Sequence, residues 1–328
     1  MDQPALIFNG IYLYWHGIFM AAAIALGIGA AVLLSRLFQR DKASDVFDAA
    51  LLAIPCGLVL SRLLYCISNF EEYHSLTDLL RFAEGGYGLS GAILGAFLAA
   101  VVLHTLRKTS SLGAICDSLA AGGALGIAAG KLTGYVSLDN VGEEITQSRF
   151  QCFPLSVYDP STDHWFLATF LMVSVAELVI FGILCGFFAH YNDEKKGIRG
   201  QNGDIALLFL LLHGAVNVAF DTMQTDALRF PGNSFVMMQQ VFGAIALVAV
   251  MTVWTVRSAK RDGFRRYHLM ALTVFAAAIG IAAWMEFDRI SDTNYYRNHI
   301  IQFLAMLCAS AIGLAMYRTT LPQEQTES

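Results

Sequence analysis

Two basic side chains, Arg62 and Lys131, lie inside long apolar stretches of this sequence. A charged residue in a membrane-spanning helix costs about 3 kcal/mol on insertion scales, so it usually faces the bundle interior and has a function. Lysine would act there as a point charge on phosphate, and arginine as a planar fork. The pair suggests a site for an amphiphile whose anionic head group binds the cations while its tails pack on apolar helices.

Further ionisable residues reach the same depth when counted from the predicted helix ends at about 1.5 Å per residue. His16 begins a predicted span, Asp221 ends one, and Arg229 follows in the next loop. These residues gather in the outer half of the membrane. An alternative is that each one extends to the interface or pairs with a carboxylate for structural reasons, and the sequence leaves both interpretations open. Others lie inside apolar stretches as well: Asp117, Glu177 and His213.

The composition requires most of these stretches to face lipid. Hydrophobic residues make up 56% of the 328, charged residues make up 14%, and the mean hydropathy is +0.55. A soluble domain carries about 25% charged residues. No basic stripe is present, so we expect no nucleic-acid partner.

About nine segments have the length and apolarity of a transmembrane helix, which needs about 20 residues. Long apolar runs indicate helices because backbone polar groups must be satisfied within the bilayer. A membrane β-barrel would show alternating stretches of about ten residues, which are absent from this sequence. We therefore predict an all-α, polytopic integral membrane bundle with spans near 12–35, 47–68, 87–106, 113–136, 165–190, 204–222, 234–256, 268–287 and 298–317.

Lys and Arg are distributed unequally between the two sides of these spans, and the richer side is the cytoplasmic one. The richer side carries Arg36, Arg40, Lys42, Arg107, Lys108, Lys195, Lys196, Arg199, Arg257, Lys260, Arg261, Arg265, Arg266 and Arg318. The other side carries Arg81, Arg149, Arg229, Arg289 and Arg297. We predict an external N-terminus, a cytoplasmic C-terminus and a multi-pass location in a bacterial cytoplasmic (inner) membrane. Residues 1–10 contain no Lys or Arg, so we do not expect a cleaved signal peptide.

Cysteine and glycine patterns indicate packing. The six cysteines form no CxxC pair and no Cys/His spacing typical of a metal site, so we expect no metal and no cofactor. Glycines recur at 85, 86, 88 and 91 and at 122, 123, 126 and 130. Such small residues favour close helix contacts. A phosphate-cradling loop is the weaker alternative, because no strand precedes the glycines.

Short motifs along residues 11 to 257 resemble the prolipoprotein diacylglyceryl transferase family. They are Trp15-His16-Gly17, Ser61-Arg62-Leu63, Gly85-Gly86, Gly91-Ala92-Ile93-Leu94-Gly95, Asp117-Ser118-Leu119-Ala120, Gly130-Lys131-Leu132, Pro154 with Tyr158, Gly203-Asp204, and Met238-Gln239 with Gly243. The resemblance implies a seven-span transferase domain over 1–257. Residues 258–328 would then add two transmembrane helices and a short polar tail.

The resemblance also implies an activity. Members of the family move the diacylglyceryl group of phosphatidylglycerol onto the thiol of a lipobox cysteine in a secreted precursor, and glycerol phosphate leaves. The implied partners are an anionic, phosphatidylglycerol-like phospholipid and a lipobox-containing precursor protein. Such a lipid would fit a cationic site in the outer half of the membrane.

Several positions depart from the family pattern. Ser90 stands where the family has a histidine, Lys131 replaces the signature arginine, and Gly134 replaces its asparagine. Asp139 falls on the family's downstream glutamate. Of the charged or catalytic positions, Arg62 alone is unchanged. The remaining departures are His16 for a tyrosine, Asn217 and Asp221 for an arginine and a glutamate, and Gln224 for a further arginine.

Thiol transfer requires deprotonation of the cysteine, whose unperturbed pKa is about 8.5, and fixed cations for the leaving phosphate. The expected catalytic residues are His16, Lys131 and Ser90. Ser90 cannot act as a base alone, so His16 is the candidate base, with His213 as an alternative. The expected lipid-binding residues are Arg62, Arg229, Asp139 and Asp221.

The sequence leaves three functions open. The first is a divergent diacylglyceryl transferase. The second is a catalytically inactive phospholipid-binding protein or scaffold in envelope biogenesis. The third, a secondary transporter, would explain Asp117 and Glu177, but the sequence shows no convincing inverted repeat.

Overall fold

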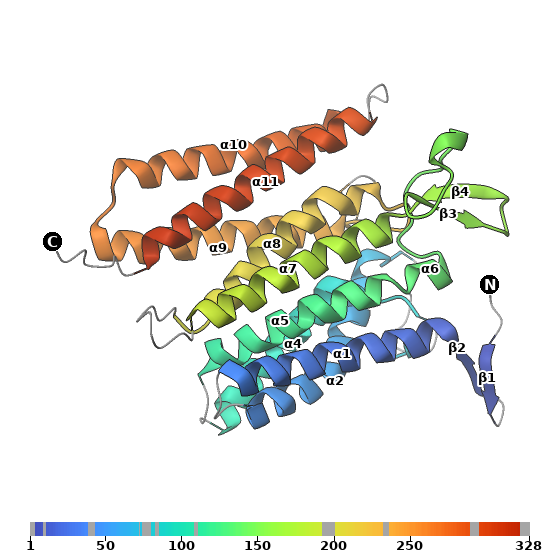
Figure 1. The fold of residues 1–328 in the computed structure, drawn as a ribbon, viewed down its shortest axis with the longest axis horizontal. Coiled ribbons are helices and arrows are strands. Elements are labelled where there is room, and N and C mark those ends of the chain that lie inside the picture. Colours follow the sequence, from blue (N-terminus) through green and yellow to red (C-terminus); the bar gives the residue numbers. More distant parts are fainter. Residues whose placement is uncertain are drawn as a thin grey trace.

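The structure is a computed structural model that describes residues 4–8, 11–38, 43–71, 73, 80–82, 85–107, 111–191, 201–231, 236–288 and 295–321. Within these residues nine helices are long and apolar enough to cross a membrane. They run roughly side by side in one bundle (Figure 1). The prediction of a polytopic all-α membrane protein is confirmed, and its orientation in the membrane stays a prediction.

The long helices alternate in direction along the chain. They are α1 (Trp15–Phe38), α2 (Ala43–Ser68), α4 (Leu89–Arg107), α5 (Leu112–Lys131), α7 (Thr169–Tyr191), α8 (Asp204–Phe220), α9 (Met238–Asp262), α10 (Arg266–Asp288) and α11 (Tyr295–Thr320). The short elements are β1 (Pro4–Phe8), β2 (Ile11–Tyr14), α6 (Gly134–Ser137), η3 (Ser148–Phe150), β3 (Ser156–Asp159), β4 (His164–Leu167) and η4 (Asp221–Met223).

Two antiparallel hairpins, β1–β2 and β3–β4, lie at one end of the bundle, which we call the hairpin end (Figure 1). Helices α1, α4, α9 and α11 all carry basic residues in their last turns, at the opposite end. This distribution matches the predicted charge asymmetry. Some residues used for that prediction lie outside the described part of the chain: Arg40, Lys42, Lys108, Lys195, Lys196, Arg199 and Arg289.

Glycines let neighbouring helices touch through their backbones. A Cβ at Gly95 of α4 would lie 2.5 Å from the Cα of Gly57 on α2, so only glycine fits there. A Cβ at Gly27 of α1 would lie 2.9 Å from the carbonyl oxygen of Gly122 on α5. The predicted role of Gly122 in packing is therefore confirmed, whereas Gly123 has nothing within 4 Å of its Cβ position, and the prediction is wrong there.

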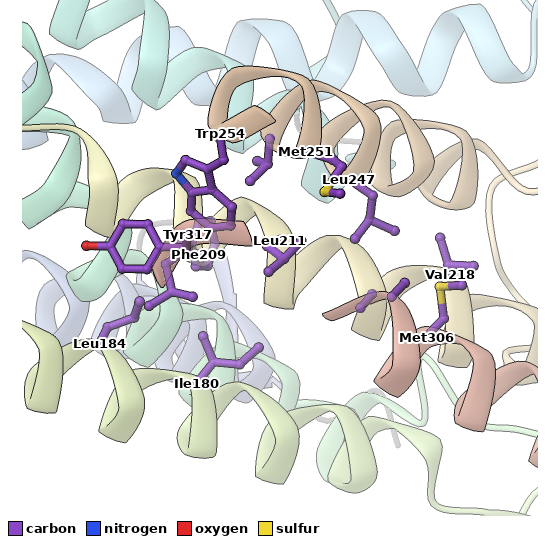
Figure 2. Close-up of a cluster of buried hydrophobic side chains, with 14 of the residues drawn as sticks. Ile180, Leu184, Phe209, Leu211, Val218, Leu247, Met251, Trp254, Met306 and Tyr317 are labelled. Carbon is purple, nitrogen blue, oxygen red and sulfur yellow. The ribbon is translucent and has the colours of Figure 1, made fainter. Parts of the chain in front are cut away.

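The largest hydrophobic core lies among α7, α8, α9 and α11 (Figure 2). Trp254 of α9 is fully buried, and its ring centroid lies 5.0 Å from that of Tyr317 on α11. Leu211 of α8 and Leu184 of α7 are also fully buried in this core. Helix α11 thus contributes buried side chains to this core.

Two predicted helix boundaries were wrong. The span predicted at 12–35 begins at Trp15, because residues 11–14 pair with β1 as strand β2. The span predicted at 165–190 begins at Thr169, because residues 164–167 pair with β3 as strand β4. Aromatic and β-branched residues suit strands as well as apolar helices, which is why hydropathy merged them with the helices. The span predicted at 113–136 is confirmed, since Leu112–Ser137 is long and apolar enough to cross a membrane and consists of α5 and α6.

Candidate active site

Lys131 is the last residue of α5, where the partial negative charge of a helix C-terminus favours a cation. Its Nζ donates a hydrogen bond to Oδ1 of Asn140 at 2.5 Å. Asn140 has a φ of 58°, a left-handed conformation that asparagine tolerates better than most residues. Its backbone N–H donates to Oδ2 of Asp226 at 2.8 Å. The chain after α5 therefore turns back over the ammonium group.

Carboxylates surround this ammonium group. Asp221, Asp226, Glu177 and Asp139 all lie within electrostatic range of Lys131. Asp221 is 2% exposed, and its Oδ2 has no hydrogen-bond partner among the described residues. We call Lys131, Asn140, Asp221 and Asp226 the lysine group. The protein itself supplies counter-charge to Lys131, so a phosphate there would share the ammonium with these residues.

Arg62 of α2 lies in a second polar group at the hairpin end and is 2% exposed. Its guanidinium donates to the carbonyl oxygens of Gly85 and Gly86 and lies 5.7 Å and 5.3 Å from the ring centroids of Tyr65 and Tyr73. Gly85 and Gly86 have φ values of 78° and 76°, which glycine adopts without strain. This backbone turn directs its carbonyls at the arginine.

Ser90 belongs to the same neighbourhood. It lies in the first turn of α4, is buried, and precedes Gly91, whose Cβ position is 2.5 Å from Cα of Ser61. The N–H of Gly88 donates to the carbonyl oxygen of Ser61 at 3.1 Å. We call Arg62, Tyr65, Tyr73, Gly85, Gly86 and Ser90 the arginine group.

The segment 224–230 joins the two groups. At one end the N–H of Thr225 donates to the carbonyl oxygen of Val141, beside Asn140. At the other end, Leu228 lies 3.3 Å from the Cβ position of Gly88, and the carbonyl of Arg229 accepts the hydroxyl of Ser68 on α2. The side chain of Arg229 is exposed. Lys131, Asp221 and Asp139 are therefore brought together, Arg62 and Ser90 are brought together, and Arg229 lies between.

His16 is the second residue of α1 and is half-buried. One turn further along α1, the sulfur of Met20 lies 3.4 Å from the Cβ position of Gly130, next to Lys131. His16 thus lies beyond Met20 toward the hairpin end. Its Nδ1 is buried and has no hydrogen-bond partner among the described residues.

His213 has a different environment. Its Nδ1 lies 2.6 Å from Oε1 of Glu177, and its Nε2 lies 2.9 Å from Nδ2 of Asn217. Because an amide nitrogen only donates, Nε2 accepts and Nδ1 carries the proton toward the carboxylate. The ring also stacks on Phe209 at 4.9 Å. Both ring nitrogens are occupied, which makes His213 a weaker candidate base than His16.

Asp117 has a structural role. Its carboxylate accepts the N–H of Gly203 and of Ala206, both at 2.8 Å, at the start of α8. This is the arrangement of a helix N-cap supplied by another helix. The transporter interpretation rested partly on Asp117, and this contact accounts for the residue without an ion pathway.

Sequence reasoning missed the partners of the site residues. Asn140 accepts a hydrogen bond from Lys131, and Gln240 lies near Asp221, but neither neighbour follows from helical periodicity. Other buried polar side chains reach the same region from α10 and α11, namely Glu286, His299 and Gln302. The resemblance at Met238-Gln239 was the nearest signal, one residue before Gln240.

The fold is that of a multi-pass membrane protein with basic and acidic side chains gathered at one end of its helical bundle. The sequence profile of the family described as Prolipoprotein diacylglyceryl transferase matches residues 4–256. The match covers most of the chain, and the protein belongs to that family. The match ends before α10 begins.

Sequence similarity to individual proteins supports the assignment to this family. The chain is similar to a phosphatidylglycerol–prolipoprotein diacylglyceryl transferase of Acaryochloris marina, with 28% identity over 67% of this chain and 78% of the relative. It is also similar to phosphatidylglycerol–prolipoprotein diacylglyceryl transferase 1 of Clostridium perfringens, with 23% identity over 80% of this chain and 98% of the relative. A third relative, from Thermotoga maritima, is 24% identical over 79% of this chain and 86% of its own length.

Proposed function

We propose that this protein is a divergent phospholipid-dependent diacylglyceryl transferase of a bacterial inner membrane. The observation that carries the proposal is the family match over residues 4–256. The relatives are named for phosphatidylglycerol and prolipoprotein. The buried Arg62 and the half-buried Lys131 lie at the hairpin end, which we propose faces outward, where a secreted acceptor would arrive.

In the proposed reaction the sulfur of a lipobox cysteine attacks the glycerol carbon next to phosphate. A C–S bond forms, the C–O bond to phosphate breaks, and glycerol phosphate leaves with the electron pair. The thiol proton passes to a base. The free Nδ1 of His16 supports His16 in that role, because accepting a proton at His213 would disrupt its bond with Asn217.

In this proposal Lys131, Arg62 and Arg229 have different roles. Lys131 stabilises charge on the leaving phosphate, since a fixed cation in a water-poor site acts strongly on developing charge. Asp221 and Asn140 hold the ammonium in place. Arg62 orders the Gly85–Gly86 turn beside Ser90, and Arg229, exposed between the groups, binds the lipid head group.

The catalytic positions that differ from the family motifs make the protein divergent in this proposal. Residues 1–257 form the transferase domain, and 258–328 add two helices and a tail. One observation favours a second candidate, an inactive phospholipid-binding scaffold. Lys131 is already hydrogen-bonded and faces four carboxylates, which weakens its attraction for a phosphate.

The test is a thiol-transfer assay with purified protein in micelles containing phosphatidylglycerol and a lipobox peptide. We expect Lys131→Ala and His16→Ala each to lower kcat by a factor of about 100 or more, a typical effect of removing an acid–base or electrostatic group. The exposed residues Arg318 and His190 lie at the opposite end and give matched controls as Arg318→Ala and His190→Ala.

Two results separate the candidates. Turnover that survives both controls and is lost in Lys131→Ala supports the transferase. Absence of turnover in the wild type, together with phosphatidylglycerol that co-purifies and is released by Arg229→Ala, supports the scaffold.

A further inference from the structure

A buried glutamate on α10 contacts the part of the bundle that holds Asp221. Oε2 of Glu286 accepts the side-chain amide of Gln240 on α9 at 3.2 Å. The amide of Gln302 on α11 lies 3.5 Å from the same oxygen. Glu286 is 8% exposed, so this carboxylate is removed from both lipid and water.

The second half of the contact comes from α11. The hydroxyl of Thr222, the residue after Asp221, lies 3.4 Å from Oε1 of Gln302 and 3.3 Å from Nδ1 of His299. We call Gln240, Glu286, Gln302, Thr222 and His299 the polar bridge. It connects α10 and α11 to η4 and to the first turn of α9.

The polar bridge acts on Asp221 through two neighbours. The backbone of Gln240 lies near the carboxylate of Asp221, and the side chain of Gln240 donates a hydrogen bond to Glu286. Thr222, directly after Asp221, is held by Gln302 and His299. Glu286 is also within electrostatic range of Asp221, which in turn faces Lys131.

Polar side chains buried at membrane depth need partners, because an unsatisfied group in hydrocarbon costs several kcal/mol. If α10 and α11 only added apolar packing surface to the bundle, we would expect apolar residues at the positions of Glu286, His299 and Gln302. The same helices have a separate polar link at the opposite end, where Ser258 of α9 contacts His268 at 3.0 Å and Thr319 at 2.8 Å. The polar bridge is therefore not needed to attach α10 and α11.

We propose that α10 and α11, which lie beyond the family match, complete the site, and that Glu286 is a positioning residue for Asp221 and Lys131. This inference rests on the proposed transferase function. Glu286 fixes Gln240, Gln240 fixes the Asp221 carboxylate, and Asp221 fixes the charge balance at Lys131. Glu286 touches no reacting atom in this arrangement.

The test compares Glu286→Gln, which keeps the size and one hydrogen-bonding oxygen but removes the charge, with Thr319→Val at the opposite end of the same helices. For Glu286→Gln we expect kcat to fall at least tenfold with KM for the lipobox peptide unchanged. For Thr319→Val we expect an unchanged kcat per folded molecule, even if its melting temperature falls. Equal kcat in Glu286→Gln and the wild type, or an equal loss in both variants, overturns the inference.

Absence of turnover in the wild type would refute the proposed function itself. The inference about Glu286 would then be tested by a second measurement. Melting temperatures of Asp221→Asn, Glu286→Gln and the double variant form a cycle that measures their coupling. We expect a non-additive shift for this pair and an additive one for Asp221→Asn with Thr319→Val. An additive shift for Asp221 with Glu286 would then overturn the inference.

Discussion

Arg62 shows how backbone carbonyls and aromatic rings can contact a buried charge. Its guanidinium is held by two glycine carbonyls and two tyrosine rings. Arginine stays charged in proteins and offers donors in a fixed fork, which suits this arrangement. The sequence predicted that Arg62 lies inside a long apolar helix, and it is in α2. The sequence did not reveal the partners, since residues 85 and 86 are more than 20 positions away.

Substitution of Arg62 tests this arrangement. In Arg62→Leu the carbonyls of Gly85 and Gly86 lose their donor, and each buried unsatisfied acceptor costs about 1–3 kcal/mol. We expect a clearly lower melting temperature in detergent and a smaller loss in Arg62→Lys. Arg318→Leu, at an exposed site, is the control. A melting temperature unchanged in Arg62→Leu would show that the two carbonyls do not depend on Arg62.

At the scale of elements, the apolar pattern predicted nine spans, and the structure describes nine such helices. Hydropathy could not separate β2 from α1 or β4 from α7, because an apolar strand beside an apolar helix forms one continuous signal. Hydropathy also does not predict contacts between residues far apart in the sequence. The polar bridge joins η4 and α9 to residues 46 to 80 positions further along the chain, such as Gln240 with Glu286 and Thr222 with Gln302, and such pairs produce no periodic pattern.

The α2–α4 contact gives a prediction about packing. In Gly95→Ala the new methyl group would lie 2.5 Å from Cα of Gly57, so the two helices must separate. Overpacking of this kind costs about 1–3 kcal/mol. Gly123→Ala is the matched control, because nothing lies within 4 Å of its Cβ position. We expect thermal unfolding to be lowered in Gly95→Ala only, and equal effects in both variants would contradict the close contact.

The core shared by α9 and α11 gives a second prediction at this scale. Trp254 is fully buried against Tyr317, whereas Trp284 on α10 is 68% exposed. Truncating a buried tryptophan to alanine costs about 3–5 kcal/mol. We expect Trp254→Ala to lower the melting temperature strongly and Trp284→Ala to change it little. Similar melting temperatures for the two variants would argue against α11 as part of the core.

At the scale of the whole molecule, the two ends differ in chemistry. The hairpin end carries the lysine group, the arginine group and both hairpins, and the opposite end carries the basic last turns of α1, α4, α9 and α11. From this difference the positive-inside rule predicts that the hairpin end faces outward. The rule predicted this separation from sequence, because it depends only on counting charges between spans.

Thiol labelling tests the orientation. Cys152 is exposed at the hairpin end, so a membrane-impermeant maleimide should label it in intact cells. Cys152→Ser should remove that labelling. Thr320→Cys, introduced in the Cys152→Ser background, should react only after permeabilisation. The reverse pattern would show that the hairpin end faces the cytoplasm.

The most direct test of the central claim is the stoichiometry of the reaction. Purified wild-type protein would be incubated with phosphatidylglycerol and a lipobox peptide, and thioether-linked diacylglyceryl peptide would be quantified by mass together with released glycerol phosphate. We predict one glycerol phosphate per modified peptide, and neither product with Lys131→Ala. Glycerol phosphate without peptide modification, or no product from correctly folded wild-type protein, would contradict the account.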